Sequence, residues 1–508
     1  MKKNHFITLP KLCGFVFLGV STLFLASCAQ DGFDDETFRS DVFGSQLDSP
    51  LADNIVVTPS ADGKSQTITW PVVQGAGGYL ISLYDESNPN EAIVKDSLID
   101  GCSVTLKREE DMVYKFTIRT LGNAEKQNTE AETTTEKLIS TFTPTFATIP
   151  AGSDLNAYFA ENPIPDEALT EMLNYDLVGG ADYTLSDVLD FDGHKITLRS
   201  NSKVNHAKIT YTTDQAGITT TAAMNIKYLD FDCSALPENK GVFAFSKNTT
   251  VAAAKDIDNT KWSWAGPVIE EPITIVNSNF ENVGGYFFWD NQVTTAVMTL
   301  LIDNVVCHLT PAKSIAGGVI WTNKGGHINT LTVSNSTFWE SDNSAGDFKY
   351  FYQAGMDTSQ GMYVSGSDYA KNAKNYVNYL NSTFYHVAWN SGQWGNYNGM
   401  QGKAYSYWTM TECIFYDCST SGSVPRRFLH GRKYADGSEN VTFRNNTYMK
   451  KDGTFQDINA DGGHDYDLSG TTIDEDPMFA NPAVGDFHIS GATQIARKTG
   501  DPRWLPEN

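Results

Sequence analysis

Hydrophobic and polar residues alternate along residues 51–120, with the period of two that half-buried β-strands show. Strands are expected at Ser65–Trp70, Gly78–Tyr84 and Val113–Thr120, and a glycine-rich turn precedes the second of them. The pattern predicts a β-sandwich with Trp70 and Tyr114 in its core. Nothing in this region has a catalytic character.

A short strand with a polar centre and an apolar or aromatic end returns six times later in the chain. The copies are Ile275–Phe280, Leu301–Val306, Val333–Phe338, Tyr379–Phe384, Met410–Phe415 and Phe443–Tyr448. Their last residues are 26, 32, 46, 31 and 33 positions apart. Variable spacing around a constant strand suits a coil of stacked strands whose loops vary in length. The repeats therefore predict a right-handed parallel β-helix, in which Asn and Ser form ladders and aromatic rings stack.

The residues before these repeats predict the start of the same coil. Short strands at 195–198, 208–211 and 226–231 are expected to form earlier turns. Upstream of them, Asp154 can cap the N-terminus of a short helix that carries Leu155, Tyr158 and Phe159 on one side. We expect this helix to cover the open end of the coil, because the exposed ends of stacked repeats need covers. The chain as a whole is predicted to be all-β.

The N-terminus has the pattern of a secretory signal. Lysines 2, 3 and 11 precede an apolar stretch over residues 15–25, and small residues close it. Leu25-Ala26-Ser27-Cys28 resembles the bacterial lipobox, in which the cysteine becomes the lipid-bearing N-terminus. We expect a signal peptide over 1–27 and a lipidated tether over 28–50. The acidic residues after Cys28 resemble an export signal for surface lipoproteins, and a solvated linker is the alternative.

Composition narrows the classes of protein that fit. The formal net charge of −24 argues against general nucleic-acid binding, which needs a basic surface. A hydrophobic content of 40% excludes a wholly disordered chain. Removal of Cys13 with the signal and of Cys28 to lipid leaves Cys102, Cys233, Cys307, Cys413 and Cys418. This odd set contains no CxxC pair, so we expect small buried side chains rather than disulfides or a zinc site.

Two stretches carry family resemblances. The string TITWPVVQGAGGYLISLYD resembles the fibronectin type III fold, which implies a spacer or binding module over residues 51–145. The order of lipobox, this module, IPAGSDLNAYFAENP, the VNSNF-type strands and the end segment Asp476–Trp504 resembles a family of Bacteroidota lipoproteins. These lipoproteins have a pectate-lyase-like β-helix, which here would be residues 146–508. They are described as domains of unknown function, and polysaccharide-utilisation loci encode them. The resemblance implies an outer-membrane protein, displayed on the cell surface, that contacts a polysaccharide beside glycan-uptake proteins. The resemblance does not decide whether the protein binds the polysaccharide or cleaves it.

Two long insertions, over residues 341–374 and 386–408, are expected to hold the site, because function concentrates on loops. The second is rich in aromatic residues among Gly and Asn. Flat rings pack against the C–H faces of sugars, so its candidate glycan-binding residues are Trp389, Trp394, Tyr397, Lys403 and Tyr405. The alternative is that these rings pack the loop onto the β-helix. Trp408 is expected to be core.

A cationic segment follows at Pro425–Lys433 and is unusual in so acidic a chain. Its candidate ligands for uronate or sulfate oxygens are Arg426, Arg427, His430, Arg432 and Lys433. We expect the segment to form the next strand of the same turn and to face the same groove as the aromatic loop. The alternative is that these side chains pair with the many acidic residues.

The same cations carry the alternative of an enzyme. A lyase could use one of them, or Lys403, as base, but the six repeats offer only Asp303 and Glu412 as carboxylates for calcium. A glycosidase needs two carboxyl groups roughly 5–10 Å apart, for which Glu340 and Asp417 are available. No catalytic residue is therefore assigned.

No cofactor is assigned either. The stretch 457–462 matches the start of an EF-hand loop, but its twelfth position is Leu468 where the bidentate Glu is needed. An Asx or glycine turn is the expected structure there, and calcium is the alternative. The leading hypothesis is a non-catalytic surface lipoprotein that captures a polysaccharide for utilisation, with an acidic polysaccharide as one candidate. A polysaccharide lyase or hydrolase is the second hypothesis, and an adhesin is the third.

Overall fold

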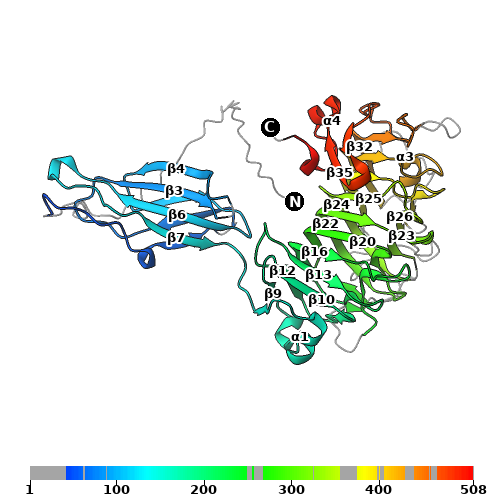
Figure 1. Ribbon diagram of the computed structural model, residues 1–508, viewed down its shortest axis with the longest axis horizontal. Helices are drawn as coiled ribbons and strands as arrows, with labels where there is room; N and C mark the ends of the chain where they lie inside the picture. Colours follow the sequence, from blue (N-terminus) through cyan, green and yellow to red (C-terminus); the bar gives the residue numbers. More distant parts are fainter. Residues whose placement is uncertain are drawn as a thin grey trace, which may run out of the picture. The chain divides into compact units, whose positions relative to one another are not determined.

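The computed structural model describes residues 42–506, apart from 61–62, 87, 249–254, 257–266, 324, 355–373, 398–399, 401–405, 430–439, 457 and 459–465. The chain divides into two compact units, residues 1–141 and 142–508 (Figure 1). The division falls close to the expected boundary after residue 145. Within the described ranges, no helix is long and apolar enough to span a bilayer. The predicted signal peptide and Cys28 lie outside the described residues.

The first unit is a β-sandwich of antiparallel strands. One sheet has the order β1 (Val56–Pro59), β2 (Ser65–Thr69), β5 (Ser103–Lys107); the other has the order β4 (Ala92–Ile99), β3 (Tyr79–Asp85), β6 (Val113–Thr120), β7 (Thr135–Ser140). Short 3-10 helices occupy Ala52–Asn54 and Ala124–Lys126. Three strands thus face four, which confirms the predicted sandwich.

The predicted core residues of the sandwich are confirmed. The Trp70 ring lies 5.4 Å from the Tyr79 ring and 6.1 Å from the Phe116 ring, and all three side chains are buried. Tyr114 is also buried, and its hydroxyl accepts a hydrogen bond from the backbone N–H of Glu109 at 2.9 Å. The alternating pattern therefore placed these aromatic residues correctly on the inner faces.

The second unit is a parallel β-helix, as predicted, and each of its turns visits up to three strand columns (Figure 1). The first column is β8 (Ala147–Ile149), β9 (Leu173–Leu177), β12 (Ile196–Ser200), β15 (Met224–Lys227), β20 (Ile273–Val283), β22 (Ala296–Leu309), β24 (His327–Ser334), β27 (Asn375–Leu380), β30 (Ser406–Thr411) and β32 (Val441–Arg444). The second column is β10 (Asp182–Leu185), β13 (Ala207–Tyr211), β16 (Leu229–Asp232), the later halves of β20 and β22, β25 (Thr337–Glu340), β28 (Thr383–Tyr385), β31 (Ile414–Tyr416) and β33 (Thr447–Met449). Because β20 and β22 run through both columns, the two columns form one bent sheet.

The third column is a separate sheet, which we call the third sheet. Its strands are β11 (Val188–Asp190), β14 (Gly217–Thr220), β17 (Gly241–Phe245), β21 (Tyr286–Trp289), β23 (Ile315–Thr322), β26 (Phe348–Ala354) and β29 (Gln393–Tyr397). An excursion between β17 and β20 holds β18 (Lys255–Asp256) and β19 (Pro267–Ile269). The early strands at 196–200 and 207–211 confirm two of the predicted lead-in strands. The predicted strand at 226–231 is instead divided between β15 and β16, because the chain bends at Tyr228, whose φ is 57°.

Asparagine residues make the bend between the first two columns. Asn277, Asn304, Asn335, Asn381 and Asn445 have φ values between 44° and 54°, in the left-handed region that Asn tolerates better than most residues. Their side chains bond from turn to turn, since the Asn304 Nδ2 donates to Asn277 Oδ1 at 2.6 Å. The predicted polar ladder is therefore confirmed, and it both fixes the bend and links successive turns.

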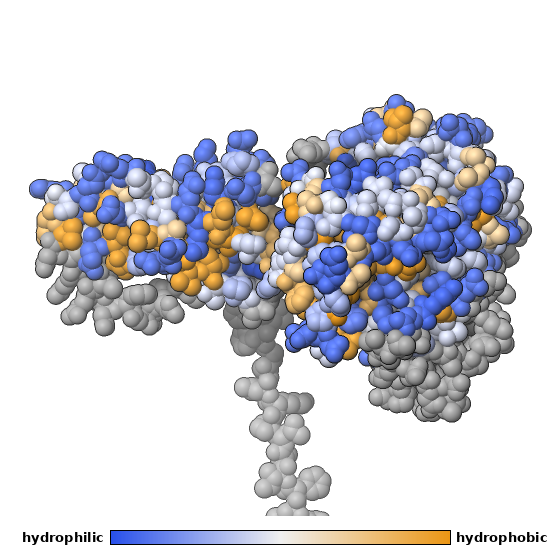
Figure 2. Space-filling view, turned by 60° about the horizontal axis from the view of Figure 1, so that its bottom comes forward, coloured by the Kyte–Doolittle hydropathy of each residue, from blue (hydrophilic) through white to orange (hydrophobic). Residues whose placement is uncertain are grey.

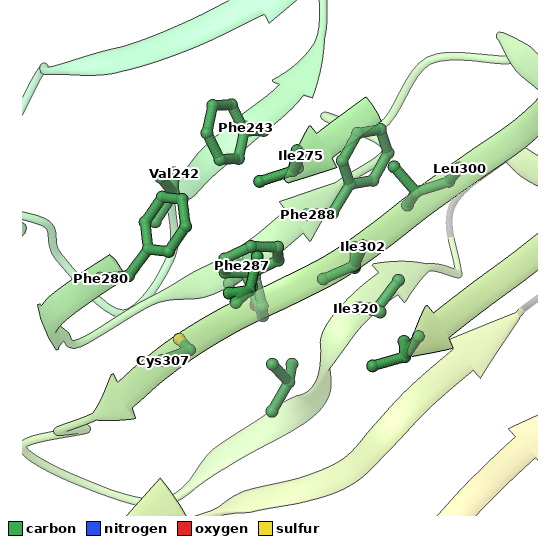
Figure 3. Packing of buried hydrophobic residues seen from close by; sticks show 14 of the residues in the cluster. Val242, Phe243, Ile275, Phe280, Phe287, Phe288, Leu300, Ile302, Cys307 and Ile320 are labelled. Atoms are coloured by element: carbon green, nitrogen blue, oxygen red, sulfur yellow. The ribbon is translucent and has the colours of Figure 1, made fainter. Parts of the chain in front are cut away.

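An inward-facing stack of aromatic rings runs along the second column. Phe231 lies 4.7 Å from Phe280, and further along the axis Phe384 lies 5.1 Å from Phe415, with nearly parallel rings in both pairs. The strand register pairs Phe280 with Cys307 and Cys307 with Phe338, so the cysteine occupies one position of the stack (Figure 3). The predicted second copy, Leu301–Val306, was therefore wrong by one residue: Ile302–Cys307 is its aligned extent. The sequence did not indicate this register, because Cys307 has a small thiol where the aligned residues Phe280 and Phe338 have rings.

A helix covers the first turns of the β-helix. Asp154 caps α1 (Leu155–Glu161) by accepting from the Ala157 N–H at 3.0 Å, as predicted, and Phe159 packs 5.0 Å from the Tyr175 ring. A 3-10 turn at Asp166–Leu169 follows. The cover of the first turns is thus a helix with one apolar side.

The C-terminal segment packs along the outer face of the second column. It contains β34 (Phe479–Asn481), a 3-10 turn (Pro482–Val484), β35 (Asp486–Ile489), α4 (Ala492–Arg497) and a 3-10 turn (Pro502–Trp504). Thr337 Oγ1 donates to Asp501 Oδ2 and accepts from Trp504 Nε1, each at 2.8 Å. Phe487 packs against Trp339 and Tyr385. The conspicuous end segment of the sequence is therefore a structural cover.

The cysteines behave as predicted. Cys233, Cys307, Cys413 and Cys418 are free and buried, and Cys102 is free and partly buried. Each of the four is a small apolar side chain within the β-helix core.

Candidate functional site

A groove of about 590 Å³ crosses the outer face of the third sheet, and we call it the third-sheet groove. Strands β11, β14, β17, β21 and β23 and the turns beside them contribute its lining. It is lined by Val188, Asp190, Gln215, Ala216, Gly217, Thr219, Asn239, Lys240, Gly241, Ala244, Lys247, Asn248, Tyr286, Trp289, Asn291, Gln292 and Trp321. The groove therefore belongs to the first half of the β-helix.

Three aromatic rings form one end of this groove. The strand register pairs Trp289 with Trp321, so the two indoles lie on neighbouring turns. The Tyr286 ring lies 4.6 Å from the Trp321 ring and 5.8 Å from the Trp289 ring. Trp321 is partly exposed, whereas Tyr286 and Trp289 are mostly buried beside it. Burial raises the pKa of Tyr286 to about 12, so its ring is neutral at physiological pH.

Small residues on the preceding strands make the hollow. Along this register line, Thr219 and Ala244 precede Trp289 and Trp321. A Cβ atom on Gly241 would lie 2.9 Å from Cβ of Trp289, closer than real Cβ contacts allow. The step from small to large side chains along one line of the sheet therefore produces a depression bounded by rings.

Amides and two lysines line the rest of the groove. Gln215, Asn239 and Gln292 are exposed. Lys240 Nζ donates to Gln215 Oε1 at 3.3 Å, and Lys247 Nζ lies 5.9 Å from the Trp289 ring. Neither lysine forms an ion pair with any residue in the described ranges. Amides and ammonium groups beside an indole can bond to sugar hydroxyls while the ring packs against the sugar face.

Trp389, the first of the residues predicted from the sequence, lies on the turn between β28 and β29 and is half-buried. Its ring stacks on His386 at 4.3 Å, and its Nε1 donates to Glu340 Oε2 at 3.0 Å. The remaining surface of the indole is available for contact, so its role in glycan binding stays a prediction.

Trp394 and Tyr397 are core residues, and the prediction that they bind glycan is wrong. Both have 0% relative exposure. The aromatic insertion contains a strand, β29, whose residues 394 and 397 face the core. Trp394 stacks on Phe351 at 4.8 Å, and Tyr397 packs 4.9 Å from Trp408. Trp408 is core as predicted, and the alternative that the rings pack the loop onto the helix holds for this pair.

A buried carboxyl pair lies beneath Trp389. Glu340 and Asp347 interact with each other, and both are almost fully buried. Burial raises the pKa of Glu340 well above its usual range and that of Asp347 to about 7, although backbone N–H groups such as that of Asn390, 2.8 Å away, oppose the latter change. Oε1 of Glu340 and Oδ1 of Asp347 lack other hydrogen-bond partners in the described ranges. Burial and the neighbouring Asp347 carboxylate therefore both favour the protonated form of Glu340.

A second buried pair joins successive turns at the same corner. His386 Nδ1 lies 2.6 Å from Asp417 Oδ2, and the imidazole is fully buried. Both residues have left-handed φ values and follow strands β28 and β31, which pair in parallel. The corner after the second column therefore carries Glu340, His386 and Asp417 on consecutive turns.

The cationic segment begins with a helix rather than the predicted strand. Ser423 precedes α3 (Val424–Phe428), in which Pro425 occupies the first turn, a position that suits proline. Arg427 Nε donates to the Ser421 carbonyl at 2.6 Å, so this side chain closes the preceding turn. Arg426 lines a pocket of about 460 Å³ that also includes Asp417. Arg427 therefore has a structural role in the turn, whereas Arg426 is part of a pocket lining.

Several predicted residues lie outside the described ranges. These are Lys403, Tyr405, His430, Arg432 and Lys433, and the EF-hand-like stretch 457–462 for the most part. In the part of the chain that is described, no group of three or more His, Cys, Asp or Glu side chains is arranged to hold a metal ion.

The third-sheet groove was not anticipated from the sequence, although a signal for it exists. Trp289 and Trp321 are 32 positions apart, close to the spacing of 31 between the aligned residues Cys307 and Phe338. Two tryptophans one turn apart predict neighbours on a sheet face. The pattern of an aromatic-rich loop does not include these two residues, because each stands in an apolar strand.

Comparisons with known proteins match successive parts of the chain. Three family models match, each described as a domain of unknown function: DUF4992 over residues 1–185, DUF4957 over 181–341 and DUF5123 over 377–504. No curated protein matches. Among solved structures, the chain is similar to pectate lyase PelI from Erwinia chrysanthemi in complex with tetragalacturonic acid. The identity is 10% and the TM-score 0.22, over 71% of this chain and 88% of that one. The fold assignment therefore rests on the strand pairing of this chain.

Proposed function

We propose that this chain is a lipid-anchored protein of a bacterial cell surface that captures a polysaccharide in the third-sheet groove. The observation that carries the proposal is the partly exposed Trp321, supported by Tyr286 and bordered by amides and lysines. Ligand sites of this kind combine a largely preformed hollow with a few polar groups that fix orientation. A groove on the side of a β-helix also suits a long ligand, because the sheet extends along the helix axis.

The N-terminal features support delivery to the surface. Cys28 follows a signal-like segment, and lipid on that cysteine would anchor the chain to the outer membrane. The sandwich would then act as a spacer that carries the β-helix away from the membrane. Outer-membrane glycan-uptake proteins are the partners that such a capture protein would serve.

The buried acids favour capture over hydrolysis. A glycosidase needs two carboxyl groups that reach the scissile bond. Glu340, one of the carboxylates considered for hydrolysis, is paired with Asp347 below the surface, and the two are 0% and 3% exposed. Asp417 is engaged by His386. The described carboxyl groups of this corner are therefore engaged within the fold and do not present a catalytic pair.

Native affinity electrophoresis tests the groove. Gels containing individual neutral and acidic polysaccharides are run with the lipid-free chain of residues 29–508, which we call the mature chain, and with Trp321→Ala. For the polysaccharide that retards the unaltered chain most, we expect Trp321→Ala to weaken binding about tenfold, as truncation of a central aromatic contact does. Trp321→Phe keeps a ring and is expected to lose less.

Trp389→Ala is the matched comparison, because Trp389 is the half-buried tryptophan of the loop predicted from sequence. Loss of retardation in Trp389→Ala with full retardation in Trp321→Ala would move the site to the β28–β29 turn and overturn the groove. Circular dichroism on each variant confirms that the fold is retained.

A further inference from the structure

Another hollow of the β-helix, which we call the Lys450 pocket, has a different charge character from the third-sheet groove. Its volume is about 460 Å³, and its described lining includes Arg426, Lys450 and Lys451. Three cations around one hollow are unusual in a chain of formal charge −24. The pocket and the groove share no lining residue.

Strand geometry explains how these cations come together. Lys450 directly follows β33, and Asp417 directly follows β31, which pairs with β33 through Tyr416 and Met449. The two residues therefore lie on adjacent turns at the same corner. Helix α3, which departs from this corner, brings Arg426 to the same pocket. Residues from three separate segments thus converge.

The acids of the pocket are engaged locally and offset part of its positive charge. Asp417 Oδ2 is bonded to His386, and Asp452 accepts from the N–H and hydroxyl of Thr454 at 3.0 and 2.6 Å. Lys450 and Lys451 make no ion pair with any residue in the described ranges. Hydrogen bonds from Thr454, and then the nearby Lys450 charge, lower the pKa of Asp452, so this acid offsets part of the positive charge. Lys451 and Arg426 add two further cations that can attract a carboxylate or sulfate from solvent.

The pocket also has an apolar wall. Ile458 and Tyr466 contribute to it, and Tyr466 packs on the β-helix core. An apolar wall facing cations suits a ligand with a flat, weakly polar body and an anionic substituent. An acidic sugar residue has this combination.

We propose that the Lys450 pocket is a second glycan subsite, which binds the carboxylate or sulfate of an acidic sugar. The inference rests on the proposed capture of a polysaccharide and adds its chemical class. The groove holds the chain through aromatic and amide contacts, and the pocket selects chains that bear anions. Two sites on one rigid β-helix would raise the avidity for a polymer above that of either site.

The test uses three polymers of defined charge: polygalacturonate for carboxylate, dextran sulfate for sulfate and dextran as the neutral polymer. Affinity electrophoresis compares the mature chain with Lys450→Gln/Lys451→Gln and with Arg426→Gln. The control, Lys95→Gln/Lys208→Gln, removes the same charge from exposed lysines outside the pocket.

We expect the Lys450→Gln/Lys451→Gln variant to bind one of the two anionic polymers about tenfold more weakly, and the control to bind as the unaltered chain does. Arg426→Gln should weaken binding to the same polymer, and the retention of the variants by dextran should not change. The polymer affected identifies the anion as carboxylate or sulfate.

Equal losses in the pocket variant and the control would show diffuse attraction and overturn the subsite. Absence of retention of the unaltered chain by either anionic polymer would overturn it as well. Trp321→Ala distinguishes the two proposals. If Trp321→Ala does not change retention while the Lys450→Gln/Lys451→Gln variant does, the third-sheet groove is refuted as the binding site and the Lys450 pocket is supported.

Discussion

At the scale of single residues, the buried pair of Glu340 and Asp347 ties the fold to pH. The pair joins two consecutive turns, because Glu340 accepts from Trp389 and Asp347 accepts from the Asn390 N–H. In the unfolded chain both carboxyl groups ionise near pH 4. In the folded chain the raised pKa of Asp347, about 7, retains a proton to higher pH. Between about pH 4 and pH 7 the folded state therefore binds more protons, and stability falls as pH rises.

Glu340→Gln should reduce this dependence. The amide keeps the shape of the protonated acid and can donate to Asp347, which then ionises closer to its usual range. Each unit by which the pKa falls is about 1.4 kcal/mol of pH-dependent stability removed. Calorimetric Tm values for the β-helix transition, measured from pH 5 to pH 8, should fall less in Glu340→Gln than in the unaltered chain. Glu136→Gln, an exposed acid of the sandwich, is the control. Parallel curves for Glu340→Gln and the unaltered chain would refute the interaction between the two carboxyl groups.

Residue identity alone predicted some of these positions and misled on others. Asp154 could be assigned as a cap because its role depends on the next few residues only. Trp394 and Tyr397 could not be assigned, because an aromatic residue among Gly and Asn fits a loop surface and a short inward-facing strand equally well. Burial of these rings depends on Phe351 of β26, 43 residues before Trp394, and on Trp408 of β30, 11 residues after Tyr397.

At the scale of elements, the aromatic stack of the second column holds successive turns together. Phe384 is fully buried between Phe338 and Phe415, with ring centroids at 6.2 and 5.1 Å, and meets Trp394 edge-on at 4.8 Å. Each ring therefore supports the turns on both sides of it. A close-packed stack of this kind leaves little room for neighbouring turns to relax into a cavity.

Phe384→Ala should lower the free energy of unfolding by about 3–5 kcal/mol, because it leaves a cavity within the stack. Phe384→Leu keeps most of the volume and should cost clearly less. Chemical denaturation followed by tryptophan fluorescence measures both, with Val484→Ala, an exposed position, as control. An alanine variant as stable as the leucine variant would show that the stack is not a main source of stability.

The repeat pattern was a strong predictor of elements and a weak predictor of the segments between them. The bend residues and the stacked rings recur in the sequence because each turn places the same demand on them. Cys307 broke the pattern because a buried cysteine fills a ring position only when its neighbours compensate. The segment around Arg426 forms a helix, α3, in place of a strand, since proline at its start fits the first turn of a helix. That preference is local and could have been recognised.

At the scale of the whole molecule, one continuous core of the β-helix supports the third-sheet groove and the Lys450 pocket, which differ in chemistry. The third-sheet groove lies on the earlier turns and the Lys450 pocket on the later ones. Hydrophilic residues are spread over the visible face of the molecule, with smaller hydrophobic groups between them (Figure 2). The fold class could be read from the repeats, but the groove required the register between turns, which sequence spacing gives only after the strands are aligned.

The central claim is that the chain captures a polysaccharide without cleaving it, and one measurement tests it most directly. The mature chain is incubated with a panel of neutral and acidic polysaccharides in the presence of calcium. Retardation, reducing ends and the ultraviolet absorbance of unsaturated uronates are read on the same samples. We predict retardation by at least one polysaccharide with no product of either kind. Product formation from the bound polysaccharide would contradict capture alone and make the chain an enzyme.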